Sequence, residues 1–140
     1  MKNVLTRALA MSASAGVLLG GMVLAAPAAS AGAQGCTGSN LRTDAVLLCT
    51  NVTGESNRVE NVHASIDIAE YTCNADFKVW GTYANGKKFS DTGHAKCGAG
   101  RVWVDFKPKS QQFKSGTKVC GALVEYGKVR REHACVEIKK

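Results

Sequence analysis

The chain has 140 residues, of which 45% are hydrophobic and 21% charged, and its formal net charge is +7 at pH 7. This length suits one globular domain after an N-terminal signal and excludes two full domains. The sequence contains six cysteines, but it has no Cys-x-x-Cys or His-x-x-x-His spacing, which argues against a zinc site.

Residues 1–31 have the pattern of an export signal. Two basic residues precede an apolar stretch from Ala8 to Ala26, and a run of small residues follows it. This order predicts a signal peptide cleaved after Ala31, with Ala33 as the alternative site. Because no second apolar stretch of spanning length follows, we expect a secreted, extracellular protein that does not insert into a membrane after cleavage.

Residues 32–44 are the least patterned part of the chain after the signal. The segment is rich in Gly, Ser, Thr and Asn, and Leu41 is its only large apolar side chain. It is predicted to be a flexible N-terminal segment, either a frayed terminus or an edge strand. A sharper interpretation is an arm that orders against a partner, in which case Leu41 would contact that partner.

Residues 45–140 are predicted to form a single all-β domain. From Val62 to Ile68, apolar residues alternate with polar ones, which is the period of a strand with one buried face. Strands are expected at residues 45–52, 62–68, 73–83, 89–97, 102–106, 117–126 and 129–138. Seven short strands at this spacing predict a small, disulfide-stapled antiparallel β-sandwich, with a small β-barrel as the alternative.

All six cysteines follow the predicted cleavage site, and an even number in an exported chain predicts disulfides rather than metal or redox chemistry. Residues 84–86 resemble a three-residue hairpin loop with Gly86 in the left-handed conformation. That register places Cys73 directly opposite Cys97, near bridging range. The sequence therefore predicts a Cys73–Cys97 disulfide.

A second hairpin predicts the next bridge. Gly127-Lys128 suits a two-residue type II′ turn with glycine first, and this register places Cys120 opposite Cys135. A Cys120–Cys135 disulfide is therefore predicted. Cys36 and Cys49 then remain as the third pair by elimination.

Charge is distributed unevenly along the chain. Residues 32–77 carry two basic and six acidic residues, whereas residues 78–140 carry fourteen basic and five acidic ones. Lys128, Arg130 and Arg131 form one basic cluster. The asymmetry fits either an ordinary solvated surface or contact with an anionic partner, such as an acidic protein surface or a cell-wall polyanion. A nucleic acid is not expected, because export separates the protein from it and no nucleic-acid-binding motif occurs.

The two tryptophans do not follow the aliphatic stripes of their strands. Trp80 and Trp103 each fall in phase with polar and charged neighbours, which places them where aromatic side chains anchor protein partners or sugars. A bend or bulge in the strand would instead return them to the core. The predicted partner-binding residues are Trp80, Trp103, Lys128, Arg130, Arg131 and Leu41.

No catalytic constellation is apparent. The three histidines are scattered, and the sequence has no nucleophile-elbow, zinc-protease or phosphate-loop motif. The eleven acidic residues offer no particular pair for a glycosidase. We expect no enzymatic activity, no metal and no cofactor.

Residues 100–106, 113–121 and 135–138 resemble a type of small secreted actinobacterial protein. They read Gly-Arg-Val-Trp-Val-Asp-Phe, Phe-Lys-Ser-Gly-Thr-Lys-Val-Cys-Gly and Cys-Val-Glu-Ile. Among such proteins the chain is similar to the adaptor subunits of umbrella toxin particles, which link a long repeat-containing toxin subunit to lectin-like propeller subunits. The resemblance implies no enzymatic activity, two protein-binding faces, and an N-terminal segment, here residues 32–44, inserted into the propeller's cleft.

We therefore expect a non-enzymatic secreted binding protein that acts as an adaptor in a secreted antibacterial toxin complex. One alternative is a secreted protease inhibitor, whose reactive loop would be residues 98–101 beside Cys97. The positive charge favours a second alternative, a free-standing basic antimicrobial protein. A third is a carrier for a small apolar ligand.

Overall fold

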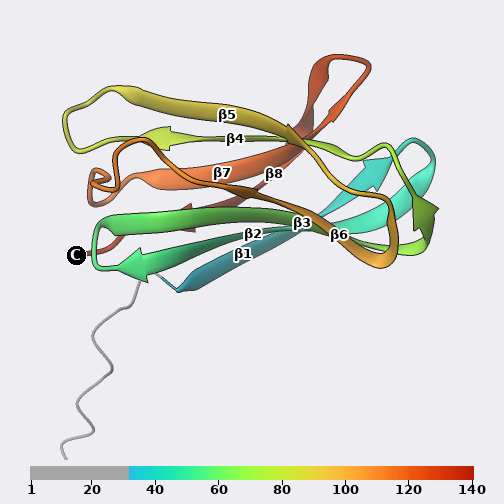
Figure 1. Ribbon diagram of the computed structural model, residues 1–140, viewed down its shortest axis with the longest axis horizontal. Coiled ribbons are helices and arrows are strands. Elements are labelled where there is room, and N and C mark those ends of the chain that lie inside the picture. Colours follow the sequence, from blue (N-terminus) through green and yellow to red (C-terminus); the bar gives the residue numbers. More distant parts are fainter. Residues whose placement is uncertain (1–31) are drawn as a thin grey trace, which may run out of the picture.

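The computed structural model describes residues 32–140, and the expected signal peptide at residues 1–31 lies outside them. Two antiparallel sheets pack face to face (Figure 1). Their strands are β1 (Ala33–Leu41), β2 (Asp44–Glu55), β3 (Arg58–Thr72), β4 (Asp76–Thr82), β5 (Lys88–His94), β6 (Gly98–Phe106), β7 (Lys118–Glu125) and β8 (Lys128–Glu137). The predicted β-sandwich is confirmed, and two separate sheets replace the alternative of a closed barrel.

The chain passes repeatedly from one sheet to the other. One sheet has the order β1-β2-β3-β6 and the other β5-β4-β7-β8, so the chain crosses between sheets after β3, β5 and β6. The disulfide Cys73–Cys97 joins the first two of these crossovers. Because the sheets pack face to face, each has one face toward the core and one outer face.

The core lies between the inner faces. In β3, Val62, Ala64 and Ile66 are fully buried, as their alternation with polar residues predicts. Near the β4–β5 turn, the ring of fully buried Phe113 lies 5.0 Å from the ring of Tyr83 and 5.6 Å from that of Phe89. This aromatic cluster packs the crossover between β6 and β7 against the β4–β5 hairpin.

The N-terminal segment is an edge strand, so that interpretation is confirmed and the alternative of a frayed, flexible terminus is wrong. Strand β1 pairs with β2 along its whole length, and the side chain of Leu41 is 4% exposed within the core. Leu41 is therefore a packing residue and not the partner contact that the sequence suggested. The polar composition of this segment suggested a flexible terminus, but it reflects the small residues that the inner side of β1 requires. A Cβ at Gly35 would lie 2.1 Å from the carbonyl oxygen of Cys135 in β8.

All three predicted disulfides are present: Cys36–Cys49, Cys73–Cys97 and Cys120–Cys135. The β4–β5 hairpin also has the predicted loop. Its Gly86 has a φ of 82°, and the Tyr83 amide donates to the Lys87 carbonyl at 2.9 Å. A three-residue loop with a left-handed glycine is therefore confirmed.

The β7–β8 turn differs from its prediction. Glu125 pairs with Lys128, so the turn residues are Tyr126 and Gly127, with φ angles of 50° and 73°. Two successive positive φ angles are the mark of a type I′ turn, not type II′. An irregularity between Ala122 and Val124 then shifts the register, so that Cys120 still faces Cys135.

Candidate functional site

Trp80 lies on the outer face of its sheet. Its neighbours Phe77, Val79 and Gly81 in β4 point into the core, while Trp80 is half-buried among outward-pointing side chains. Ser90 of β5 and Cys120 of β7 flank it directly. The ring of His133 packs edge-on against the indole at 5.7 Å. The indole is therefore fixed on one side by His133 and beside the Cys120–Cys135 disulfide.

We define the Trp80 face as the outward-pointing side chains around this indole. It consists of Lys78, Trp80, Thr82, Lys88, Ser90, Lys118, Cys120 and His133. An open hollow of about 550 Å³ lies on it, with Ser90 and Thr82 among its lining. The Trp80 indole and the three lysines of the face line it as well.

Trp103 occupies the outer face of the other sheet. Its side chain is 51% exposed, and in register it lies opposite Ser65, which lies opposite Cys49 of the Cys36–Cys49 disulfide. Another large apolar side chain, Leu47, is 45% exposed on the same face. We define the Trp103 face by the outward-pointing residues Leu47, Cys49, His63, Ser65, Asp67, Arg101, Trp103 and Asp105.

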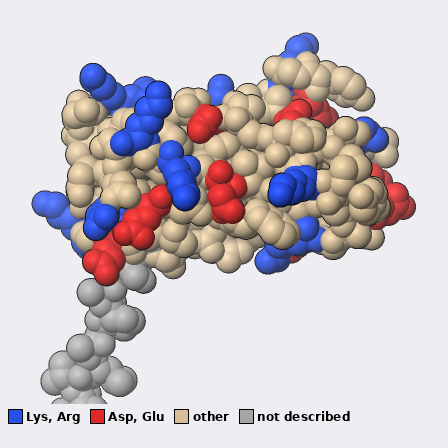
Figure 2. Space-filling view, viewed as in Figure 1, with Lys and Arg blue, Asp and Glu red and all other residues tan. Residues whose placement is uncertain are grey.

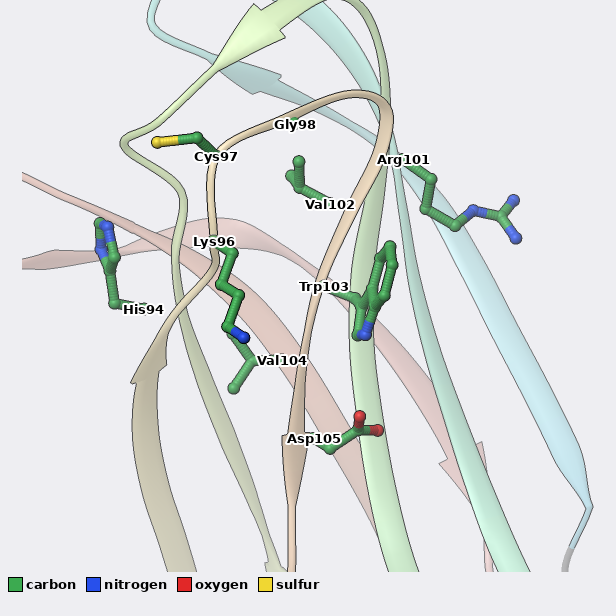
Figure 3. A pocket seen from close by; sticks show the side chains of 9 residues that line it. All are labelled: His94, Lys96, Cys97, Gly98, Arg101, Val102, Trp103, Val104 and Asp105. Carbon is green, nitrogen blue, oxygen red and sulfur yellow. The ribbon is translucent and has the colours of Figure 1, made fainter.

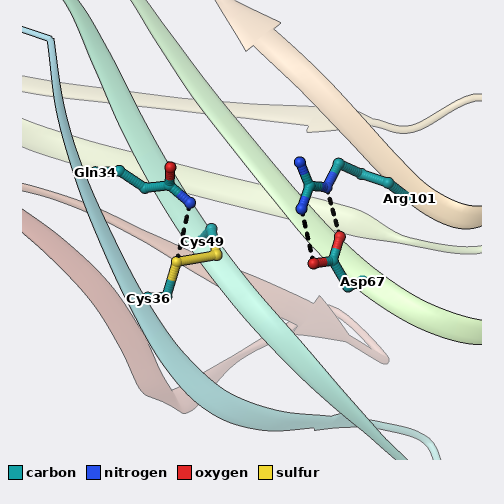
Figure 4. Close-up of a disulfide and its surroundings, with 5 residues drawn as sticks. All are labelled: Gln34, Cys36, Cys49, Asp67 and Arg101. Atoms are coloured by element: carbon teal, nitrogen blue, oxygen red, sulfur yellow. Dashed lines mark hydrogen bonds and ion pairs between the residues drawn. A yellow bond between two sulfur atoms is a disulfide. The ribbon is translucent and has the colours of Figure 1, made fainter.

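The charged groups of the Trp103 face are paired with one another. The Arg101 guanidinium binds both carboxylate oxygens of Asp67, with Nη2 donating to Oδ2 at 2.8 Å, and this contact lowers the pKa of Asp67 (Figure 4). The Asn61 amide and the His63 ring each contact Oδ1 of Asp105 at 2.8 Å and hold the pKa of that carboxyl below its ordinary value. The ring of His63 also lies 6.2 Å from that of Trp103.

A second hollow, of about 570 Å³, lies beside Trp103 on the side where β5 and β6 are edge strands. Figure 3 shows Trp103, Arg101 and Asp105 on one side of β6, and His94 and Lys96 on the other. The hollow therefore extends the Trp103 face around the edge of its sheet.

The structure separates the two predicted aromatic contacts. Their outward orientation is confirmed, and the alternative of core packing is wrong, because β4 and β6 keep a regular alternation at both residues. Trp80 and Trp103 belong to different sheets, so they lie on opposite outer faces. They cannot form one contact surface.

The basic cluster of β8 divides in the structure. Arg130 is half-buried, pairs with Glu125 at 3.2 Å and donates to the Asn40 carbonyl at 3.2 Å, so it ties β8 to the β1–β2 hairpin. Lys128 and Arg131 are exposed. Figure 2 shows basic and acidic side chains interspersed over the visible side, so the sequence asymmetry produces no continuous basic patch there.

Sequence reasoning missed the three lysines of the Trp80 face. Lys78 shares the strand phase of Trp80, and this signal was present in the sequence. Lys88 lies on the same face in the predicted β4–β5 register, opposite Thr82, whereas Lys118 joins the face only because β7 lies on the other side of β4. The local sequence pattern of a strand does not specify which strands lie beside it in the sheet.

Within residues 32–140, no group of three or more His, Cys, Asp or Glu side chains is placed to hold a metal ion, and no helix there is long and apolar enough to cross a membrane. The three disulfides are consistent with an extracellular protein. The chain matches no family model, no curated protein and no solved structure. The function is therefore inferred from the two outer faces.

Proposed function

We propose that the protein is a secreted, non-enzymatic adaptor that binds one partner protein on each outer face of the sandwich. The observation that carries this proposal is the placement of Trp80 and Trp103 on the outer faces of opposite sheets. A partner that covers one tryptophan leaves the other free. The molecule can therefore hold two partners at once.

The surroundings of each tryptophan support a role in protein binding. Tryptophan is enriched among the residues that dominate interface energetics. Each indole lies in a row of residues that includes a cross-strand disulfide, Cys120–Cys135 for Trp80 and Cys36–Cys49 for Trp103. A stapled pair of strands needs little further ordering when it binds, which lowers the entropic cost of association.

Secretion and the adaptor role belong to the same proposal. The export pattern of residues 1–31 and the three disulfides support secretion. The resemblance to toxin-particle adaptors suggests the partners: a large repeat-containing subunit and a lectin-like subunit of an antibacterial complex. In this protein the contacts would come from the two faces, since β1 is integral to the sandwich.

A protease-inhibitor role receives less support. Residues 98–101 would form its reactive loop, but they lie at the start of β6, where Gly98 pairs with Thr72. Arg101 is bound to Asp67. An inhibitor presents its contact side chain on a free, protruding loop, and this segment is paired along the sheet.

Affinity purification of tagged Trp80→Ala and Trp103→Ala variants from the native culture supernatant tests the adaptor role. Each variant should bind a different one of the two partners more weakly. The affinity for that partner should fall by roughly thirtyfold or more, as expected for a central aromatic contact. The matched control is Tyr126→Ala, because Tyr126 is 92% exposed in the β7–β8 turn and belongs to neither face. It should retain both partners.

Two results would contradict the proposal. If both tryptophan variants keep every partner of the wild type, the faces are not binding sites. If both lose the same single partner, the protein is not bivalent. Thermal unfolding of each variant separates these results from a failure to fold.

A further inference from the structure

We infer that the two faces take partners of different charge, and that the Trp80 face binds an acidic segment of a partner protein. This inference rests on the proposed function and adds the chemistry of one of the two partners. It comes from a difference between the faces: the charges of the Trp103 face are matched internally, and the lysines of the Trp80 face are not.

The three lysines surround Trp80 in the register of the sheet. Lys88 of β5 lies opposite Thr82, two residues along β4 from Trp80. Lys118 of β7 is two residues from Cys120, the direct neighbour of Trp80, and so occupies the same flank. Lys78 precedes Trp80 by two residues in β4 and occupies the other flank. Cationic side chains therefore lie on both sides of the indole.

These cations are available to a ligand. None of the three lysines forms an ion pair with any residue in the range 32–140, and Lys88 has only a hydrogen bond to the Thr82 hydroxyl at 3.2 Å. Two carboxylates lie at the margin of the face. Asp76 is paired with His94, and Glu137 lies opposite Lys118 in register. None of the three lysines is thus neutralised by an ion pair within the described part of the chain, although Lys118 has Glu137 opposite it in register.

The Trp103 face shows the opposite arrangement. Arg101 is bound to Asp67, and His63 contacts Asp105. A charged partner would gain little attraction there, because Arg101, the only lysine or arginine among the residues that define this face, already has a carboxylate within hydrogen-bond distance. The exposed Leu47 and Trp103 instead favour an uncharged, apolar contact.

The shape of the Trp80 face favours a protein segment as its occupant. The hollow of about 550 Å³ is lined by the Trp80 indole, by short side chains and by the three lysines. An apolar core with a charged rim is the arrangement of protein interfaces. A peptide can place an apolar side chain against the indole and carboxylates near the lysines at the same time.

The two tryptophans make the test specific to each face, since the chain contains no others. In Trp103→Phe the fluorescence reports on the Trp80 face, and in Trp80→Phe it reports on the Trp103 face. The probes are a short synthetic peptide that repeats Glu-Ser-Leu-Glu and its counterpart with Gln in place of Glu. The protein is expressed from the full sequence with export to an oxidising compartment.

The Glu peptide should change the fluorescence of Trp103→Phe and leave that of Trp80→Phe unchanged. Its binding should weaken by roughly tenfold when Gln replaces Glu, and again as the salt concentration rises. Adding Lys78→Glu, Lys88→Glu and Lys118→Glu to Trp103→Phe should weaken it by roughly tenfold or more. A matched triple, Lys109→Glu, Lys139→Glu and Lys140→Glu, changes the net charge equally at residues outside the hollow and should retain the binding.

Three outcomes would overturn the inference. The first is an equal loss in the two triple variants, which would mean attraction by net charge alone. The second is an equal response of both tryptophans, and the third is binding of a uronic-acid polysaccharide where the peptide fails. If Trp80→Ala loses a native partner while the Lys78, Lys88 and Lys118 reversals do not, the adaptor proposal stands and this inference fails.

Discussion

Single residues decide how closely β1 approaches β8. A methyl group on Gly35 would lie 2.1 Å from the carbonyl oxygen of Cys135, which is backbone and cannot rotate away. We expect Gly35→Ala to destabilise the fold by roughly 1–3 kcal/mol, because β1 must shift away from β8. Urea unfolding followed by circular dichroism measures this change.

The control lies in the same strand. Gly38 has nothing within 4 Å of an added Cβ, so Gly38→Ala should change stability by no more than about 0.5 kcal/mol. Equal effects of the two substitutions would show that the close contact with β8 does not limit this strand.

Asp105 gives a prediction about pH. Hydrogen bonds from Asn61 and His63 hold its pKa below the ordinary value of 3.8. A lowered carboxyl pKa stabilises the fold above the unfolded-state value, and this contribution disappears as the pH falls through the folded-state pKa. Asp105→Asn should therefore lower Tm at pH 6 by a few degrees at most, and the difference from wild type should vanish as the pH falls below about 4.

Thermal unfolding from pH 2 to pH 6 measures this effect. The control is Asp44→Asn, because the Asp44 side chain has no hydrogen bond or ion pair with the described residues. Its Tm difference from wild type should not depend on pH. A difference in Tm between Asp105→Asn and wild type that persists at pH 2 would contradict the assignment of this effect to the lowered pKa of Asp105.

Strand β1 is an edge strand that a disulfide links to its neighbour. It hydrogen-bonds to β2 on one side only, and Cys36–Cys49 is its covalent link to that strand. Replacing both cysteines with serine should cost about 3 kcal/mol, the value for a loop of this length. The amides of residues 33–41 should then exchange hydrogen faster than those of the central strands β3 and β7, because a one-sided edge strand can open locally.

Replacing Cys120 and Cys135 with serine is the matched control. That bridge closes a similar separation, 15 residues against 13, so the loss of stability should be comparable. The amides of β1 should keep their protection. If the amides of β1 exchange equally fast in both double variants, the strand opens only when the whole domain unfolds.

The hairpins show how far local pattern predicts an element. The loop at Gly86 specified both the turn and the register of β4 and β5, because it is a common loop type with a glycine where the left-handed conformation is required. The second hairpin has the predicted disulfide but a different turn. Its register changes at the irregularity near Ala122, and no feature of the turn sequence encodes that change.

For the whole molecule, the arrangement of the two sheets determines what can bind. Each tryptophan points outward on its own sheet, and the sheets pack with their inner faces together. The predicted contact residues consequently divide into two separate faces, with Leu41 in the core and Arg130 tied to Glu125. A bivalent adaptor is the function that this division supports best.

The Cys36–Cys49 bridge followed only by elimination, and the Cys120–Cys135 bridge followed from a turn type that the structure does not have. Local pattern in the chain was enough to predict the β class, the outward phase of both tryptophans and the Cys73–Cys97 disulfide. These features follow from the two-residue period of a strand and from turns between neighbouring strands, which are short-range properties. The packed molecule was needed to show that β1 is an ordered strand, that Trp80 and Trp103 lie on opposite faces, and that Lys78, Lys88 and Lys118 surround one of them. These features depend on crossovers that bring distant segments together, and packing between the sheets selects those crossovers.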